Sequence, residues 1–205
     1  MEAIIGKKIG MTSIFNADGK NLPCTIVKIS DCVVTQVKTI ETDGYNAIQI
    51  ASGDIKEKHS NKAMIGHFKK SNTGPKSRVL EFRVDEITHK VGDVLTAESF
   101  EEGEYVDVYA NSKGKGFQGV VKRHGFGGVG QSTHGQHDRS RAPGSIGASS
   151  FPSRVFKGMR MAGQMGNKRI KSINNRVIRI LKEENAIILS GSVPGHNGTT
   201  IVIEK

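Results

Sequence analysis

The chain has 205 residues, with 30 Lys and Arg against 20 Asp and Glu, a formal charge of +10 and a pI of about 9.7. This length buries a core without disulfide bonds, and the basicity favours a polyanionic partner such as nucleic acid. No apolar run approaches the roughly 18 residues of a membrane span, and residues 1–8 lack the apolar core of a signal peptide. Cys24 and Cys32 are too few for a disulfide scaffold and fit a reducing cytosol.

The first 50 residues predict short β-strands separated by turns. Asp18-Gly19 is a strong hairpin signal, and a turn is also expected at residues 6–8 and at Thr42–Gly44. The predicted strands are residues 4–5, 9–11, 25–29, 32–38 and 45–50. Turns at intervals of 8–12 residues favour a barrel or a sandwich.

Residues 60–74 interrupt the strand pattern with apolar residues at helical spacing, and Gly74-Pro75 ends the segment, so a short helix is expected there. Strands are again expected at 80–84, 91–95 and 105–109.

After residue 111 a helix is expected over Phe117–His124, and residues 125–166 show no sustained periodicity. Such a long irregular stretch is usually functional or disordered. Residues 176–181, 186–189 and 199–203 then predict a β-meander that closes the same sheet.

The charge is concentrated in one segment. Residues 111–176 carry 13 Lys and Arg and one acid, Asp138, which gives a net charge of +12. The other 139 residues carry 17 basic and 19 acidic residues, a net charge of −2. The same segment holds 13 of the 25 glycines, so a near-neutral β body is interrupted by one basic, glycine-rich excursion.

Gly114–Gly119 matches the G-x-G-x-x-G pattern of nucleotide-binding loops. A dinucleotide site needs a second parallel strand ending near Asp138, and residues 125–130 have no strand character. The chain also lacks the V-A-I-K, H-R-D and D-F-G motifs of a kinase. The glycines are better explained by close approach of the backbone to phosphates that Lys113 and Lys115 neutralise.

Catalytic and metal sites find little support in the basic segment. His134 and His137 stand three residues apart, but no paired cysteines and no H-E-x-x-H motif accompany them. The serines lack a G-x-S-x-G elbow, and one carboxylate cannot provide an acid and a base.

Residues 151–169 alternate basic side chains with Phe156, Met159, Met161 and Met165. A solvated basic loop would explain the composition, but the apolar residues suit packing into a shallow groove of RNA. Such a segment has too little to bury alone, so we expect it to become ordered against RNA.

Ordered motifs along the whole chain resemble the bacterial-type large-subunit ribosomal protein L3 family. They include Ile5–Thr12 (IGKKIGMT), Val34–Lys38 (VTQVK), Ser112–Phe117 (SKGKGF), Pro143–Gly147 (PGSIG) and Met161–Asn167 (MAGQMGN).

The resemblance implies a non-enzymatic, mainly β protein of the cytoplasmic ribosome, with no cofactor, metal, membrane or small-molecule substrate. A closed β-barrel body of residues 1–110 and 176–205, with a helical insert near 60–74, would lie at the particle surface beside other ribosomal proteins. The extension, residues 111–175, would bind large-subunit ribosomal RNA early in assembly. Its tip, residues 132–153, would point toward the peptidyl transferase centre, and residues 155–171 would lie along RNA helices.

Two sets of candidate residues follow from the charge pattern and the resemblance. The expected RNA contacts are Lys7, Lys8, Lys113, Lys115, Lys122, Arg123, His134, His137, Arg139, Arg141, Arg154, Lys157, Arg160, Lys168, Arg169 and Lys171. The expected tip residues near the peptidyl transferase centre are Gly144, Ser145, Ser149, Ser150 and Phe151.

The chain departs from the family at one position. Many bacterial members carry a glutamine, methylated on its side-chain amide, where this chain has Ser150. A hydroxyl cannot carry that modification, so a methyltransferase partner is not expected. Two other readings remain open: an RNA-modifying or nucleotide-dependent enzyme that uses Gly114–Gly119, and a nucleic-acid chaperone that binds many RNAs alike.

Overall fold

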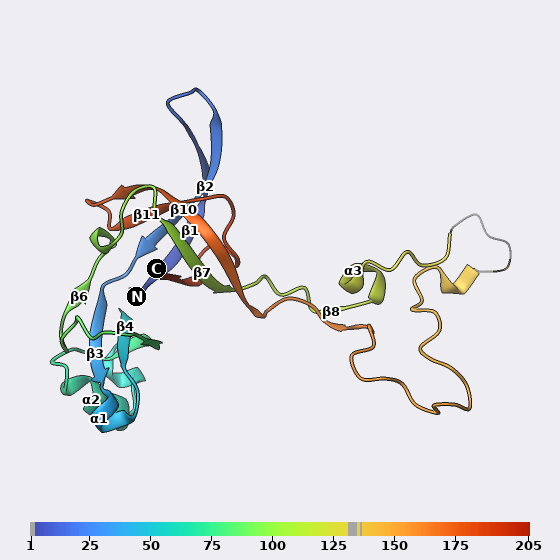
Figure 1. The fold of residues 1–205 in the computed structure, drawn as a ribbon, viewed down its shortest axis with the longest axis horizontal. Helices are drawn as coiled ribbons and strands as arrows, with labels where there is room; N and C mark the ends of the chain where they lie inside the picture. The colour runs from blue at the N-terminus through green and yellow to red at the C-terminus, as the bar shows by residue number, and fades with distance from the viewer. Residues whose placement is uncertain (1–2, 131–134, 136) are drawn as a thin grey trace. The chain divides into compact units, whose positions relative to one another are not determined.

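The computed structural model describes residues 3–130, 135 and 137–205, which form two compact units. The first unit, here called the body, comprises Met1–Asn111 and Arg169–Lys205. The second, here called the extension, comprises Ser112–Lys168 (Figure 1).

The body is built on a closed barrel in the order β1-β12-β7-β10-β11-β2, in which every neighbouring pair is antiparallel. The strands are β1 (Ala3–Phe15), β2 (Asn21–Ile29), β7 (Tyr105–Asn111), β10 (Arg169–Leu181), β11 (Ala186–Ser190) and β12 (Thr200–Glu204). Closure satisfies both edges of every barrel strand over its paired length. The expectation of a mainly β protein with a closed barrel is confirmed.

A second sheet in the body has the order β5-β4-β3-β6. Its strands are β3 (Cys32–Lys38), β4 (Ala47–Asp54), β5 (Lys76–Arg83) and β6 (Val94–Leu95). Short helices lie in the connections: α1 (Ile40–Asp43) between β3 and β4, and η1 (Glu57–His59) and α2 (Lys62–Lys69) between β4 and β5. A further turn, η2 (Ala97–Ser99), follows β6 and leads to β7 of the barrel. The predicted helix is thus confirmed as α2, where the Asn61 side chain accepts a hydrogen bond from Met64 N at 2.8 Å and Phe68 is buried.

One hydrophobic core joins the barrel to the second sheet, because Ile4, Val27 and Ile203 of the barrel cluster with Val34 and Ile50 of the sheet. The period-2 alternation of a strand is clear in β7, which buries every second residue and turns the others outward.

The turn predicted at residues 6–8 is wrong, because β1 runs through it from Ala3 to Phe15. A Cβ atom at Gly6 would lie 2.7 Å from Val27 Cγ1 and 2.9 Å from the Lys28 carbonyl oxygen. Glycine is needed here for the close packing of β1 on β2, and not for a change of direction.

The predicted meander and the predicted end of the extension also need correction. β12 pairs with β1 and β7 instead of with β11, so the last three strands are not a meander. β10 begins at Arg169 and pairs with β7 from Arg169↔Asn111 onward, which places residues 169–175 in the barrel. β-branched runs and period-2 alternation identify the strands in a sequence, but they do not identify which strands pair with each other.

Lys8 is a buried structural residue, only 5% exposed. Its ammonium group donates hydrogen bonds to the carbonyl oxygens of Val193 at 2.6 Å and Gly195 at 3.2 Å. It therefore ties β1 to the segment before β12, and this burial makes Lys8 a weak candidate for an RNA contact.

Replacing Lys8 with methionine keeps most of the side-chain volume but leaves those two carbonyl oxygens without the ammonium donor. We expect Lys8→Met to lower the free energy of unfolding by about 1–3 kcal/mol, as measured by urea denaturation. Lys20→Met, in the exposed turn between β1 and β2, is the matched control and should change it little. Equal effects of the two substitutions would contradict a structural role for Lys8.

Candidate nucleic-acid interface

The two ends of the extension form a paired segment, here called the neck (residues 112–125 and 161–168). β8 (Phe117–Gln118) pairs antiparallel with β9 (Gly163–Gln164). Backbone hydrogen bonds of 2.9 Å also join Lys115 N to Met165 O, Met165 N to Gly116 O, and Ser112 N to Lys168 O. The neck is therefore held by main-chain bonds.

A short helix, α3 (Val120–His124), follows β8 and ends at Gly125, whose φ of 73° is left-handed. The helix predicted from Phe117 is therefore shorter than expected. Arg123 Nη1 and His124 Nε2 both lie against the Met161 carbonyl oxygen, at 2.6 and 3.0 Å. The Arg123 side chain thus has a structural partner within the neck.

Gly166 controls how closely the two sides of the neck approach. Its φ is +72°, and a Cβ atom there would overlap the Lys113 carbonyl oxygen and lie 3.2 Å from Gly114 Cα. These contacts are with backbone atoms, which cannot rotate away as a flexible side chain can. Gly114, part of the suspected nucleotide loop, is therefore packed against the opposite side of the neck.

Beyond the neck, the described part of residues 126–160 contains one regular element, the 3-10 turn η3 (His137–Arg139). A hollow of about 520 Å³ is lined by Phe126, Val129, Arg139, Ala142, Pro143 and three glycines. A hydrogen bond from Val129 N to Ser140 O at 3.3 Å joins its two sides. Apolar walls beside one guanidinium group suit an unstacked base and its phosphate. Periodicity and charge do not predict this hollow, and its signal in the sequence is the run of glycines on both sides of Phe126.

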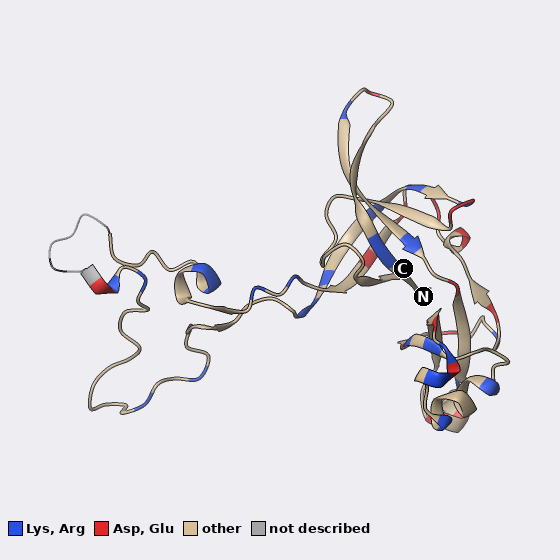
Figure 2. Cartoon of the chain, turned by 180° about the vertical axis from the view of Figure 1, so that it is seen from behind, with Lys and Arg blue, Asp and Glu red and all other residues tan. Residues whose placement is uncertain are grey.

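The extension carries ten Lys and Arg and a single acid, Asp138. Nine of the ten cations are exposed, and no ion pair joins two of the extension's described residues. Figure 2 shows this separation, with Asp and Glu almost confined to the body. The exposed cations are Lys113, Lys115, Lys122, Arg139, Arg141, Arg154, Lys157, Arg160 and Lys168.

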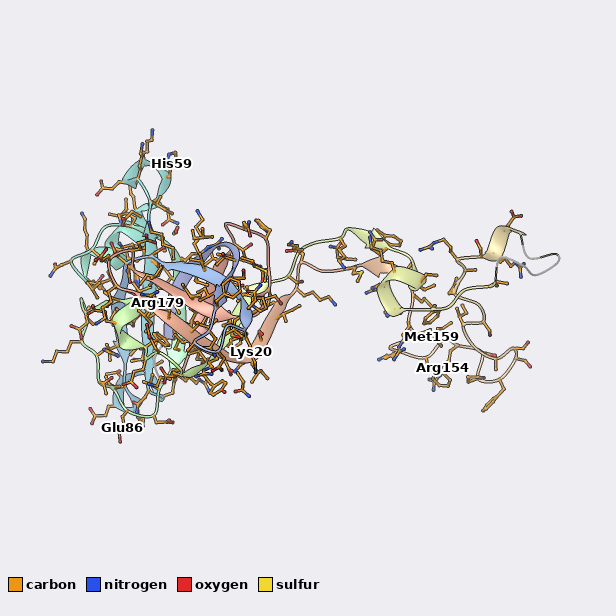
Figure 3. All side chains as sticks on the ribbon, turned by 90° about the horizontal axis from the view of Figure 1, so that it is seen from above. Lys20, His59, Glu86, Arg154, Met159 and Arg179 are labelled. Atoms are coloured by element: carbon orange, nitrogen blue, oxygen red, sulfur yellow. The ribbon has the colours of Figure 1, made fainter. Side chains whose placement is uncertain are left out.

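Large apolar side chains are exposed between these cations. Phe151 is 88% exposed, Phe117 76% and Phe156 56%, and Met159 is exposed as well. The Arg154 guanidinium lies over the Phe156 ring at 5.4 Å, and Figure 3 labels Arg154 and Met159 on this stretch. Positive charge beside exposed rings is the usual composition of a surface that binds single-stranded or irregular RNA.

The expected tip residues are exposed, and few of them make contacts. Ser145 Oγ donates to the Gly147 carbonyl oxygen at 3.0 Å, and the Ser150 carbonyl accepts from Ser153 Oγ. Gly144 has a φ of 79° and lines the hollow, and Ser149 is exposed. His134 lies outside the described residues, and of His137 only the backbone is described, at the start of η3.

Arg169 and Lys171 belong to β10 of the body instead of to the extension. Lys171 Nζ lies 2.6 Å from Asp107 Oδ2 and 3.9 Å from Glu204 Oε2, and both cations lie over the Tyr109 ring. The hydrogen bond to Asp107, and then that to Tyr109, raises the pKa of Lys171. Lys171 is therefore already neutralised by body carboxylates and is a weak candidate for a phosphate contact.

The surroundings of Gly114–Gly119 differ from a dinucleotide site. α3 has five residues, and β8 pairs antiparallel with β9 instead of leading to a parallel strand.

Among the described residues, no three His, Cys, Asp or Glu side chains gather as a metal site would require. No described helix is long and apolar enough to cross a membrane.

We expect Gly166→Ala to separate the two sides of the neck, because its Cβ atom has no space and the left-handed φ is strained for alanine. Hydrogen exchange at the Lys115 and Met165 amides should become faster, and the melting temperature of the body should stay unchanged. Gly127→Ala, which has open space and no left-handed φ, is the control. Unchanged exchange in Gly166→Ala would refute this close packing.

The Asp107–Lys171 pair predicts a pH-dependent contribution to body stability. The hydrogen bond from Lys171, and then that from Asn174 N, lowers the pKa of Asp107 below its ordinary 3.8. Because the folded-state pKa is the lower one, the stabilisation is present at neutral pH and is lost as the pH falls below about 3.8. Asp107→Asn should therefore lower the free energy of unfolding near pH 7 more than near pH 3. The control is Asp18→Asn, in the exposed β1–β2 turn. A loss of unfolding free energy in Asp107→Asn that is the same at pH 7 and pH 3 would contradict the pairing.

Comparisons with known proteins agree with the resemblance seen in the sequence. The family model for ribosomal protein L3 matches residues 49–193. The large ribosomal subunit protein uL3 of Salinibacter ruber is 54% identical over 203 residues, a match that covers 98% of each chain. This identity over nearly the whole length includes both the barrel and the basic extension, and the chain belongs to the ribosomal protein L3 family.

Proposed function

We propose that the chain is a structural constituent of the large ribosomal subunit, which binds large-subunit ribosomal RNA early in assembly and catalyses no reaction. One observation carries the RNA-binding proposal: the extension exposes nine cations and contains one carboxylate. Without a polyanionic partner, the cations of this segment would repel one another. Phosphates of an RNA supply the missing negative charge, and their counterions are released on binding.

The neck and the outer part of the extension play different roles in this proposal. Main-chain bonds and Arg123 order the neck before RNA is bound. The described residues between 126 and 160 have few internal bonds and become fixed when phosphates surround them. The two ends of the extension leave adjacent strands at Asn111 and Arg169, which limits the entropy lost on ordering.

The resemblance supports a tip that points toward the peptidyl transferase centre, in a ribosome of the cytoplasm. Ser149, Ser150 and Phe151 are exposed and available for packing against RNA there. Ser150 offers a hydroxyl group, so this role does not depend on a methylated amide. The body, with its near-neutral charge, is the part suited to contact neighbouring ribosomal proteins.

The experiment compares the intact chain with a variant in which residues 126–160 are replaced by a Gly/Ser linker, so that the neck stays paired. The binding of large-subunit RNA is titrated across a salt series, with a random RNA as competitor. Five cations are removed, so the slope of log K against log salt should become shallower by about 4. The melting temperature of the barrel should not change.

A second linker of equal length, with a lysine at each of positions 139, 141, 154, 157 and 160 in an otherwise Gly/Ser sequence, separates the effect of charge from that of shape. We expect it to restore the salt slope without the preference for ribosomal RNA. Equal binding of ribosomal and random RNA by the intact chain would favour the chaperone reading. An unchanged slope in the Gly/Ser variant would place the main RNA contact elsewhere and overturn the assignment to the extension. ATP or NAD binding by the intact chain would favour the enzyme.

A further inference from the structure

The loop between β11 and β12, residues 191–199, contains the one Asn-Gly dipeptide of the sequence, Asn197-Gly198. In an unstructured chain this dipeptide deamidates readily, because glycine has no side chain to restrict the approach of its nitrogen to the asparagine amide. The Gly198 nitrogen loses its proton and bonds to Asn197 Cγ, while the Cγ–Nδ2 bond breaks and the amide leaves with that proton as ammonia. Water then opens the cyclic imide to aspartate or isoaspartate.

Asn197 and Gly198 occupy the two central positions of a tight turn. Thr199 N donates a hydrogen bond to the His196 carbonyl oxygen at 3.1 Å. Asn197 has a negative φ and Gly198 a φ of +86°, the combination of a type II turn, which favours glycine at this place. The dipeptide is therefore required by the turn. Both of its residues are exposed, so burial does not keep water away from the asparagine amide.

One residue of β1, Lys8, holds this loop through both its main chain and its side chain. Its carbonyl oxygen accepts a hydrogen bond from Gly198 N at 2.6 Å, and its own N–H donates to the Thr199 carbonyl oxygen at 3.0 Å. Its ammonium group donates to the carbonyl oxygens of Val193 and Gly195 in the same loop. The nitrogen that would attack the asparagine amide is thus engaged in a hydrogen bond that forms only when the loop lies on β1.

We propose that Asn197 is a spontaneous modification site of the open chain, and that closure of the barrel protects it by holding the Gly198 N–H on the Lys8 carbonyl oxygen. The reaction needs this N–H to lose its proton and the nitrogen to turn toward Asn197 Cγ. Both steps require the hydrogen bond to Lys8 to break. The inference goes beyond RNA binding and uses no residue of the extension.

The modification has a consequence for the barrel. Isoaspartate adds a methylene group to the main chain between β11 and β12, so Gly198 N no longer meets the Lys8 carbonyl oxygen in register. It also adds a carboxylate close to Lys7, an exposed candidate RNA contact whose Cε atom would lie 3.9 Å from a Cβ atom at Gly198. A chain that is modified while open therefore closes into a less stable barrel.

The test incubates the full chain in mildly alkaline buffer, with and without denaturing urea, and follows the mass gain of the peptide that contains residue 197 by mass spectrometry. Deamidation should be at least about tenfold slower in the folded chain, because opening must first break the bonds between Lys8 and the loop. Hydrogen exchange at the Gly198 amide reports the same opening. Folding should therefore slow deamidation and exchange of this amide by the same factor.

Lys8→Met removes the two side-chain bonds to the loop and keeps the main-chain acceptor, so it should raise both rates in the folded chain by one common factor. Lys20→Met, in the exposed turn between β1 and β2, is the matched control and should change neither rate. Asn197→Gln should show no mass gain and should keep the melting temperature of the intact chain, because its longer side chain closes the imide ring far more slowly.

Equal deamidation rates with and without urea, while the Gly198 amide is protected from exchange, would overturn the proposal. So would faster exchange in Lys8→Met without faster deamidation. Chains deamidated in urea can be separated by their added negative charge and refolded, and their melting temperature should be lower than that of the intact chain. An equal melting temperature would overturn the effect on the barrel.

Discussion

The pairing of β7 with β10 is the interaction on which the rest of the structure depends. It is one seam of the barrel, and it ends at the pair Asn111↔Arg169, where the extension begins and returns. On the inner face of the barrel, Val106 and Val108 of β7 are buried in the common core. The same ladder therefore closes the hydrophobic body and fixes both ends of the polar segment.

The two units are stabilised by different physical means. The body buries apolar side chains and balances its surface charge with ion pairs such as Lys38–Glu81 at 2.6 Å. Lys38, and then Tyr45, lowers the pKa of Glu81, so this pair is intact at neutral pH. The extension has little to bury and almost no acid, so its order depends on main-chain bonds in the neck and on glycines that allow close approach. This division explains why one segment is suited to RNA and the other to a folded scaffold.

The sequence predicted the strands, the helix at Lys62–Lys69 and the separation of charge, because each depends on local composition or periodicity. It does not predict pairing partners: a meander would place β12 beside β11, and Gly6 predicts a turn where β1 is continuous. Among the candidate RNA contacts, charge alone could not separate Lys8 and Lys171 from the rest. Their partners, the Val193 carbonyl and Asp107, are distant in the sequence and meet them only in the folded barrel.

The position of β12 in the barrel also sets the order of events during synthesis. β12 lies between β1 and β7, so the barrel cannot close until residues 200–204 have been made. The basic extension precedes these residues in the chain. A newly made chain therefore carries its complete polycationic segment while the scaffold for that segment is still open.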